Sequence, residues 1–262
     1  MKQKIYQIDA FTDHVFGGNP AAICILEQWL DDLLLQKIAQ ENNLAETAFL
    51  VKNDTHLEIR WFTPQTEVAL CGHATLASAY VLFNYHNHKE NTIRFYSHKS
   101  GNLIVTIGEN GLLTLDFPSD TITPIKANET LEKALGLKAA KAFKGKTDYL
   151  LIYSSQSEIE ALNPNFHLLS QCDCRGVIVS APGDTADFVS RFFAPKCGIS
   201  EDSVTGSAHT TMAPYWSKVL GKNKLTAKQL SKRGGNLWIE FLGERVNISG
   251  KAVPYLIGEI NI

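Results

Sequence analysis

The sequence lacks any long apolar run. Its longest apolar stretches, such as residues 76–83, are far too short to span a bilayer. The first residues alternate as a strand does and lack the apolar core of a signal peptide. Neither sign of charge dominates, since 25 Lys and Arg oppose 27 Asp and Glu for a formal net charge of −2. These absences predict a chain whose partners are neither membranes nor nucleic acids.

Cysteine is scarce, and several chemical signatures are missing. The chain has five cysteines, an odd number without the spacing of a disulfide framework, so we expect a reducing, cytoplasmic location. Neither Cys-x-x-Cys nor His-Glu-x-x-His occurs, which argues against a resident zinc ion or other metal site. The nucleophile elbow Gly-x-Ser-x-Gly, the dinucleotide fingerprint Gly-x-Gly-x-x-Gly and the P-loop are also absent. We therefore expect neither a serine hydrolase nor a nucleotide-dependent enzyme.

What is present is a repeated motif. Residues 60–64 read Arg-Trp-Phe-Thr-Pro, and residues 191–195, half a chain length later, read Arg-Phe-Phe-Ala-Pro. Each motif is followed by a Gly that opens a predicted helix, Gly72 in the first half and Gly206 in the second. An offset of half the chain with a three-residue insertion predicts two similar halves. A chance match of short apolar patterns is the alternative.

The segments around the repeat predict the fold class. The helix expected from residue 73 to about 85 is apolar nearly all round, so it belongs inside a sheet wrapped around it. Residues 118–128, with two prolines and little apolar periodicity, are the candidate linker. We predict an α/β (α+β) fold of two similar domains, 1–117 and 118–262, each a sheet rolled around a central helix. The sequence leaves open whether the final strand returns to the first domain.

Two side chains in the first half are candidates for acid–base chemistry. Glu46 begins an apolar strand, where burial would disfavour its charged form and suit it to proton transfer. His73 stands in the first turn of the central helix, whose positive end favours a neutral imidazole. A solvated glutamate and a structural histidine are the plainer readings of the same two residues.

The second half offers candidates at the equivalent helix start. Asp202 lies just upstream of the helix, where a capping role or an Asx turn is the plainer reading. The Ser207 hydroxyl and the backbone N–H groups at Gly72 and Gly206 are suitable donors to a carboxylate. If the two helix starts face each other, they form a site for an anion. The joint placement of these residues makes them a candidate site.

Taken together, the motifs resemble a known family. Gly-Asn19-Pro-Ala-Ala, Leu-Ala-Glu46-Thr-Ala-Phe, Leu-Cys-Gly-His73-Ala-Thr-Leu-Ala and Val-Thr-Gly-Ser207-Ala-His are similar to the PhzF family, the phenazine-biosynthesis-like branch of the diaminopimelate epimerase fold. The match extends through both halves in the right order. The resemblance implies two α/β domains, each rolled around a central helix, with the active site in the cleft between them.

The resemblance also implies a function. The family's better-understood member is an isomerase that moves a proton along a cyclohexadiene amino acid without metal or organic cofactor. By motif, its proton-carrying glutamate falls on Glu46, and its supporting residues fall on His73, Asp202 and Ser207. Substrate contacts are expected from Asn19, Gly72, Gly206 and Ser207. We therefore expect a cofactor-independent isomerase of a small carboxylate-bearing substrate, working as a homodimer.

Departures from related enzymes limit this expectation. The related epimerases and proline racemases use a cysteine at each helix start, but this chain has Cys71 in the first half and Thr205 in the second. A threonine hydroxyl is far too weak an acid to replace a thiol, so two-thiol racemisation is excluded and Cys71 is expected to be a packing residue. Ser203 stands where proline is common, which predicts only a local change of turn. A non-catalytic binding protein and a one-base epimerase stay open as alternatives.

Overall fold

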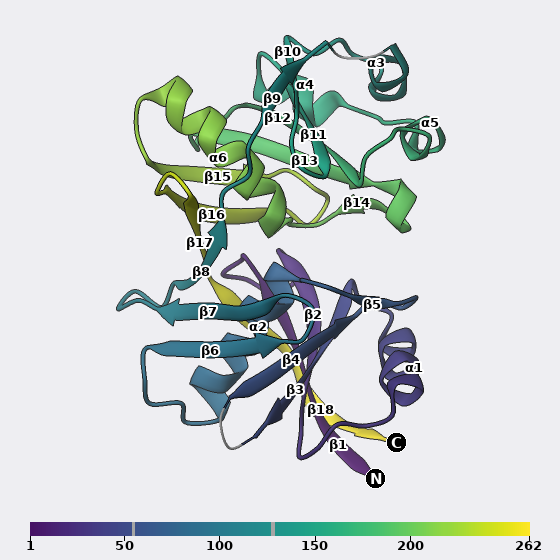
Figure 1. The fold of residues 1–262 in the computed structure, drawn as a ribbon, viewed down its shortest axis with the longest axis vertical. Helices are drawn as coiled ribbons and strands as arrows, with labels where there is room; N and C mark the ends of the chain where they lie inside the picture. The colour runs from purple at the N-terminus through teal and green to yellow at the C-terminus, as the bar shows by residue number, and fades with distance from the viewer. Residues whose placement is uncertain (54–55, 127–128) are drawn as a thin grey trace. The chain divides into compact units, whose positions relative to one another are not determined.

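The computed structural model describes residues 1–53, 56–126 and 129–262 and divides into two compact units (Figure 1). The first unit combines Met1–Asp116 with Ser249–Ile262, and the second spans Phe117–Ile248. The chain therefore leaves the first unit once and returns to it for its last strand. The elements below are described for each unit by itself.

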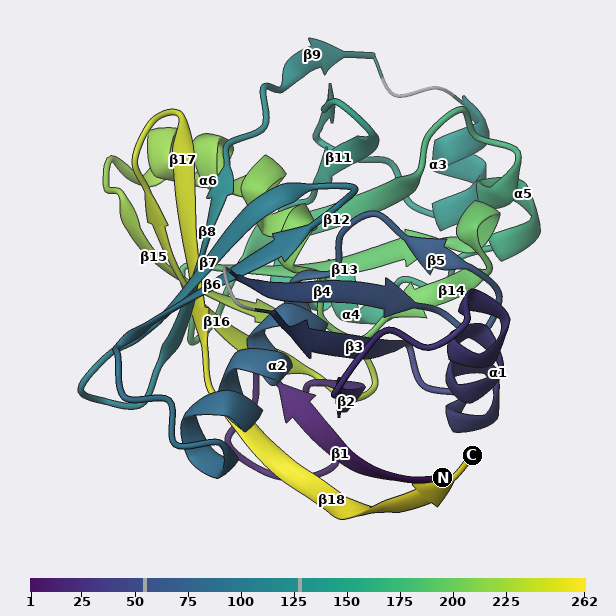
Figure 2. The same ribbon diagram turned by 60° about the horizontal axis from the view of Figure 1, so that its bottom comes forward.

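The first unit is a strongly curved sheet with one helix inside it and one outside. Its strands are β1 (Lys2–Ala10), β2 (Asn19–Leu26), β3 (Glu46–Lys52), β4 (Leu57–Phe62), β5 (Glu67–Val68), β6 (Thr92–Ser97), β7 (Gly101–Ile107), β8 (Leu113–Pro118) and β18 (Ala252–Asn261). Its helices are α1 (Asp32–Asn42) and α2 (Gly72–Tyr85). β18 runs antiparallel to β1 from Lys2↔Asn261 to Ala10↔Ala252, so the two chain ends lie side by side (Figure 2).

The helix α2 is the centre of this unit because its side chains are buried on all sides. Its nine buried residues are His73, Ala74, Thr75, Leu76, Ala77, Ser78, Ala79, Val81 and Leu82. Many of these are small, which lets strands approach the helix closely, and the hydroxyls of Thr75 and Ser78 donate to helix carbonyls at 2.6 and 2.7 Å instead of seeking water. A helix without a polar face is stable only when it is enclosed, as the sequence predicted.

The second unit contains the other helices. Its strands are β9 (Thr123–Ile125), β10 (Lys141–Lys144), β11 (Asp148–Ile152), β12 (Gly176–Pro182), β13 (Phe188–Ala194), β14 (Ile199–Asp202), β15 (Lys224–Gln229), β16 (Gly235–Phe241) and β17 (Arg245–Gly250). Its helical elements are α3 (Glu129–Leu135), α4 (Gln156–Ala161), α5 (Phe166–Ser170), the 3₁₀ turn η1 (Pro195–Cys197) and α6 (Gly206–Leu220). The helix α6 is the buried one, with nine buried residues along its length.

The two units share one strand topology. In the first, β2 pairs parallel with β3, β3 antiparallel with β4, β4 parallel with β6, and β6 antiparallel with β7. In the second, β11, β12, β13, β15 and β16 repeat this order of parallel and antiparallel pairings. The buried helix follows the short strand β5 in one unit and β14 in the other. The fold is therefore the predicted α+β arrangement of two similar domains.

A matching ion pair marks the repeated motif in both units. Arg60 Nε donates to Glu67 Oε1 at 2.8 Å, and Arg191 Nε donates to Glu201 Oε1 at 2.7 Å. Each arginine also lies over the ring two residues further on, at 5.1 Å from Phe62 and 5.0 Å from Phe193. The glutamate follows its arginine by 7 residues in the first hairpin and by 10 in the second. The three-residue insertion therefore falls in the second hairpin, where η1 lies.

One local prediction needs correction. The predicted linker is not free of regular structure, because Pro118 ends β8 and β9 pairs antiparallel with β10; its last two residues, 127–128, lie outside the described residues. Pro214 lies inside α6, which continues to Leu220. Within the described ranges no helix combines the length and apolarity needed to cross a membrane.

Candidate active site

The strands β2 and β3 bring two polar side chains to the same end of the first sheet. They pair in parallel with Ala21 opposite Glu46, so Glu46 at the start of β3 lies near Asn19 at the start of β2. Asn19 is 1% exposed and Glu46 is 9% exposed. A carboxylate and an amide are thus held in the interior of this unit, where each requires a polar neighbour.

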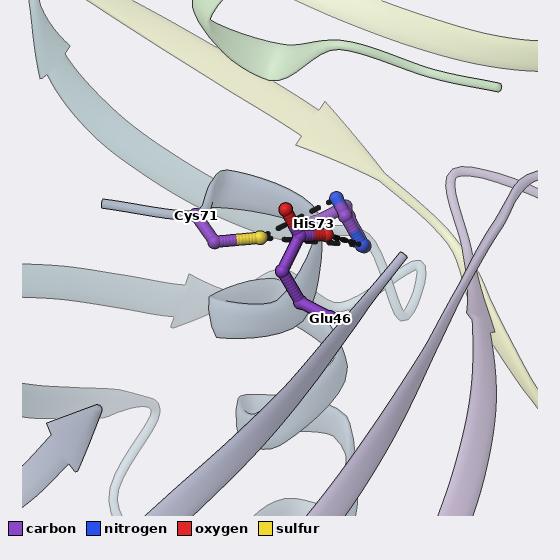
Figure 3. A group of neighbouring side chains, drawn as sticks. All are labelled: Glu46, Cys71 and His73. Atoms are coloured by element: carbon purple, nitrogen blue, oxygen red, sulfur yellow. Dashed lines mark hydrogen bonds and ion pairs between the residues drawn. The ribbon is translucent and has the colours of Figure 1, made fainter. Parts of the chain in front are cut away.

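His73, the second residue of α2, is that neighbour (Figure 3). Its Nε2 lies 3.1 Å from Glu46 Oε2 and its Nδ1 lies 3.2 Å from Asn19 Nδ2. The ring nitrogen is within ion-pair distance of Glu46, yet Oε2 has no well-aligned hydrogen bond among the described residues. The contact is therefore mainly electrostatic, and Oε2 keeps a lone pair for another proton.

The charge of His73 differs from the sequence prediction. Burial would lower its pKa, but the neighbouring Cys71 and Glu46 outweigh burial and raise the pKa well above 6.5. Because the Cys71 thiol holds its proton at neutral pH, the Glu46 carboxylate is the charge that stabilises the imidazolium there. The prediction of a neutral imidazole was wrong. The Glu46 carboxylate, 3.1 Å from His73 Nε2, favours the protonated ring more than the positive end of α2 disfavours it.

Asn19 suits this histidine in either charge state. A side-chain amide that flips about its last carbon–carbon bond presents its oxygen to a protonated Nδ1 and its nitrogen to a bare one. The 3.2 Å separation allows a hydrogen bond in both cases. Asn19 therefore fixes the orientation of the ring without fixing its protonation.

Cys71 caps the same helix but is not ionised. Its Sγ lies 3.5 Å from His73 Nδ1, and burial raises the thiol pKa to about 11, with a further increase from Glu46. A thiol with such a pKa is a poor base at neutral pH. This agrees with the expectation that Cys71 is a packing residue.

The same three side chains are the group that could hold a metal ion within the described residues. The ligand atoms of Glu46, Cys71 and His73 all lie within 4.8 Å of one another. A cation bound there would have to displace the proton of the thiol and one proton of the imidazolium. These ligands come from two separate elements, which is why the sequence shows no zinc spacing.

The helix start of the second unit is held by a buried glutamine. Gln229 accepts from Thr205 N at 2.8 Å and donates to Asp202 O at 2.8 Å, while the Thr205 hydroxyl donates to the Asp202 carboxylate. These bonds fix the turn from β14 into α6. Thr205 precedes α6 as Cys71 precedes α2 in the first unit. Its hydroxyl donates its hydrogen to the Asp202 carboxylate.

Ser207, the second residue of α6, is half-buried and contacts an arginine. Arg175 Nη2 donates to Ser207 Oγ at 3.1 Å. A Cβ added at Gly206 would meet no atom within 4 Å, so the glycine leaves the first turn open. Open backbone N–H groups at a helix start favour an anionic ligand.

The predicted site residues thus form two groups, one in each unit. The first unit brings together Asn19, Glu46, Gly72 and His73, and the second brings together Asp202, Gly206 and Ser207. Sequence reasoning missed Arg175 and Gln229 in the second group. The repeat leads only to the neighbour of Arg175: Phe49 pairs with Arg60 and Val179 with Arg191, which makes Gly176, the first residue of β12, equivalent to Glu46.

Comparisons with known proteins agree with this architecture. The family model described as phenazine biosynthesis-like protein, PhzC-PhzF, matches residues 8–258. An uncharacterized isomerase of Pseudomonas aeruginosa is 48% identical over 262 residues, with all of both chains covered. The crystal structure of a PhzF-family phenazine biosynthesis protein from Enterococcus faecalis superimposes with a TM-score of 0.97 at 46% identity, again over all of both chains.

A more distant structure shows how far the fold extends. A predicted epimerase of Pseudomonas aeruginosa has a TM-score of 0.75 at 17% identity and covers 99% of each chain, which is a likeness of fold alone. The family match spans nearly the whole chain, and the relatives match from end to end. The chain belongs to the PhzC-PhzF family of phenazine biosynthesis-like proteins.

Proposed function

We propose that this protein is a cofactor-independent isomerase that moves a proton on a small carboxylate-bearing substrate. Membership of the family, and relatives that are named isomerases, support an isomerase in general. The observation that carries the finer proposal is the buried pair of Glu46 and His73. A carboxylate and an imidazolium held together in the interior form a proton donor–acceptor system.

In this proposal Glu46 is the group that carries the proton. In the proposal Glu46 begins the reaction as a base and takes a proton from a C–H bond of the substrate. It then returns the same proton to another carbon of the substrate. Atoms and charge balance without an oxidant or metal, because the bond electrons stay in the substrate as its double bond shifts.

His73 would support both halves of this transfer. Its positive charge lies beside Glu46 and offsets the negative charge that develops on the substrate while the proton is on the carboxyl group. Asn19 would hold the ring in place through either charge state. Because Glu46 is 9% exposed, few water molecules can exchange its proton before it is returned.

The second unit would supply substrate contacts. We assign Asp202 to the amine or hydroxyl of the substrate, and the Gly206 and Ser207 amides with the Ser207 hydroxyl to its carboxylate. The helix-start geometry and the open space at Gly206 support this assignment. A two-thiol racemase is disfavoured, because the Cys71 thiol is protonated and Thr205 is bonded to Asp202.

The direct test is deuterium exchange into small carboxylates in heavy water, with products analysed by NMR and mass spectrometry. We expect the wild-type protein to place deuterium at one new C–H position of an accepted substrate, in proportion to how freely Glu46 exchanges its proton with solvent, and we expect Glu46→Gln to abolish both isomerisation and incorporation. Incorporation that persists in Glu46→Gln would move the acid–base role elsewhere, with Asp202 the next candidate. A ligand that binds but is neither isomerised nor exchanges a proton would identify a binding protein that retains the fold.

A further inference from the structure

Arg175 joins the start of a strand to the first turn of the buried helix in the second unit. It directly precedes β12, and its Nη2 donates to Ser207 Oγ at 3.1 Å. The motifs that carry the family resemblance do not include it. Its side chain is 39% exposed, so the guanidinium reaches the edge of the interior.

Buried neighbours fix the position of this guanidinium. Asp148, whose side chain is 2% exposed, accepts from Arg175 Nε at 2.9 Å and also from Nη2. The guanidinium carbon lies 5.3 Å from the centre of the Phe192 ring. A planar group held at two nitrogens and stacked on a ring has little freedom left. The atom that reaches Ser207 is therefore fixed in place.

The chemistry of arginine determines the direction of the hydrogen bond. A guanidinium offers only donors, so Ser207 Oγ accepts from it, and the hydroxyl hydrogen of Ser207 is left to donate. Among the described residues, the bond from Arg175 is found at Ser207 Oγ and no bond donated by that hydroxyl accompanies it. Ser207 is thereby held as a donor, and a donor selects an acceptor such as a carboxylate oxygen.

The repeat gives this contact a counterpart. Ser207 and His73 occupy equivalent places in the two halves, since each is the second residue of its buried helix. In the first unit the residue that touches this position from the strand start is Glu46, and in the second it is Arg175. One half therefore presents a carboxylate with an imidazolium, and the other presents an arginine with a hydroxyl.

We propose that Arg175 is a positioning residue that holds the Ser207 hydroxyl as a hydrogen-bond donor for a carboxylate of the ligand. The proposal rests on the proposed function, in that the ligand is a small carboxylate. The opposite charge of Asp148 cancels that of Arg175, and Asp202 adds a negative charge nearby. The carboxylate of the ligand is therefore recognised through directed hydrogen bonds. Loss of one such bond should weaken binding of the ligand about tenfold.

The test is a double-mutant cycle on binding, with benzoate and neutral benzamide as probes. Each is titrated into ¹⁵N-labelled protein to high millimolar concentration while the amide signals of Gly206 and Ser207 are followed. We expect benzoate to shift these signals in the wild type at lower concentration than benzamide, whose single amide oxygen is a weaker acceptor than a carboxylate. Ser207→Ala and Arg175→Lys should each weaken benzoate binding about tenfold, and the double variant should be no weaker than either, because both remove the same bond.

Controls separate positioning from damage to the fold. Arg175→Lys keeps a positive charge beside Asp148, which avoids a buried unpaired carboxylate, and Arg94→Lys is the same change at an exposed site of β6 that should leave binding unaltered. Additive losses in the double variant would overturn the proposal, and so would equal binding of benzamide or no shift with benzoate. None of these readouts needs turnover, so a failure here leaves the role of Glu46 to be judged by deuterium exchange.

Discussion

Glu46 Oε2 lies 3.1 Å from His73 Nε2 in the interior of the first unit, where both residues are buried. A buried carboxylate without a positive neighbour would be costly, and so would a buried imidazolium alone. Glu46 therefore helps to raise the pKa of His73, and each side chain is the other's buried polar partner. Loss of either partner should change both the reaction and the stability of the fold.

The first prediction concerns the carboxyl group of Glu46. Glu46→Gln keeps the size of the side chain but removes its ability to carry a proton, so turnover should fall by at least ~10²-fold. Substrate affinity should change much less, because the proposed carboxylate contacts lie elsewhere. Steady-state kinetics on a substrate found by deuterium exchange measures both. Glu41→Gln, the same change at an exposed position of α1, is the control and should have no effect; near wild-type turnover in Glu46→Gln would refute the assignment.

The second prediction concerns Cys71. Cys71→Ser should keep most of the activity, because a thiol with a pKa of about 11 holds its proton at neutral pH and Thr205 offers no partner thiol. Iodoacetamide should label the exposed Cys197 quickly and the buried Cys71 slowly, as peptide mass spectrometry can show. Cys197→Ser removes the fast site and serves as the control. A thousandfold loss of activity in a folded Cys71→Ser protein would make the thiol the base.

The third prediction is that the His73–Glu46 ion pair stabilises the folded protein less as the pH rises. The pKa of His73 is raised in the folded state, so its stabilising contribution is fully present below pH 6.5 and is lost as the pH rises through the folded pKa. Urea unfolding from pH 6.5 to 9 should show the free energy of unfolding falling more steeply for the wild type than for His73→Gln. Parallel curves for the two proteins would mean that the folded state does not hold this proton.

Much of the fold could be predicted because the two halves of the sequence share a recognisable motif. The all-round apolarity of residues 73–85 indicated an enclosed helix, and the start of β3 at Glu46 followed from an apolar run preceded by a carboxylate. The insertion of three residues was also visible, although only the structure locates it at η1. Periodicity and spacing are local properties, so local reasoning recovers them.

The rest of the candidate site depends on contacts between distant residues. The charge of His73 follows from a neighbour 27 positions away, and Arg175 meets Ser207 across 32 positions. Gln229 fixes the turn before α6 from β15, which follows that helix. No local pattern indicates such partners. The strand register of the repeat leads to Gly176, the residue after Arg175, and it requires the pairing of β12 with β13 to be known.

The last prediction concerns His209, which is fully buried in α6 and is not part of the candidate site. Its Nδ1 lies 2.8 Å from Thr205 O, Nε2 has no hydrogen-bond partner among the described residues, and burial lowers its pKa to about 4. The neutral ring donates from Nδ1 to that carbonyl, and protonation of Nε2 would place an uncompensated charge in the core.

The sign of the effect follows from proton binding. Between pH 6.5 and about 4 the unfolded chain binds a proton at this histidine and the folded chain does not, so stability falls as the pH is lowered. The full loss from this one group is about 3 kcal/mol, at about 1.4 kcal/mol for each pKa unit. His209→Asn keeps a donor for Thr205 O and cannot titrate; it should be less stable than the wild type at pH 7, yet lose less stability on acidification. His167→Asn, at an exposed site in α5, should follow the wild-type curve. If His209→Asn and the wild type lose equal stability between pH 6.5 and 4.5, the buried histidine is not the source of acid sensitivity.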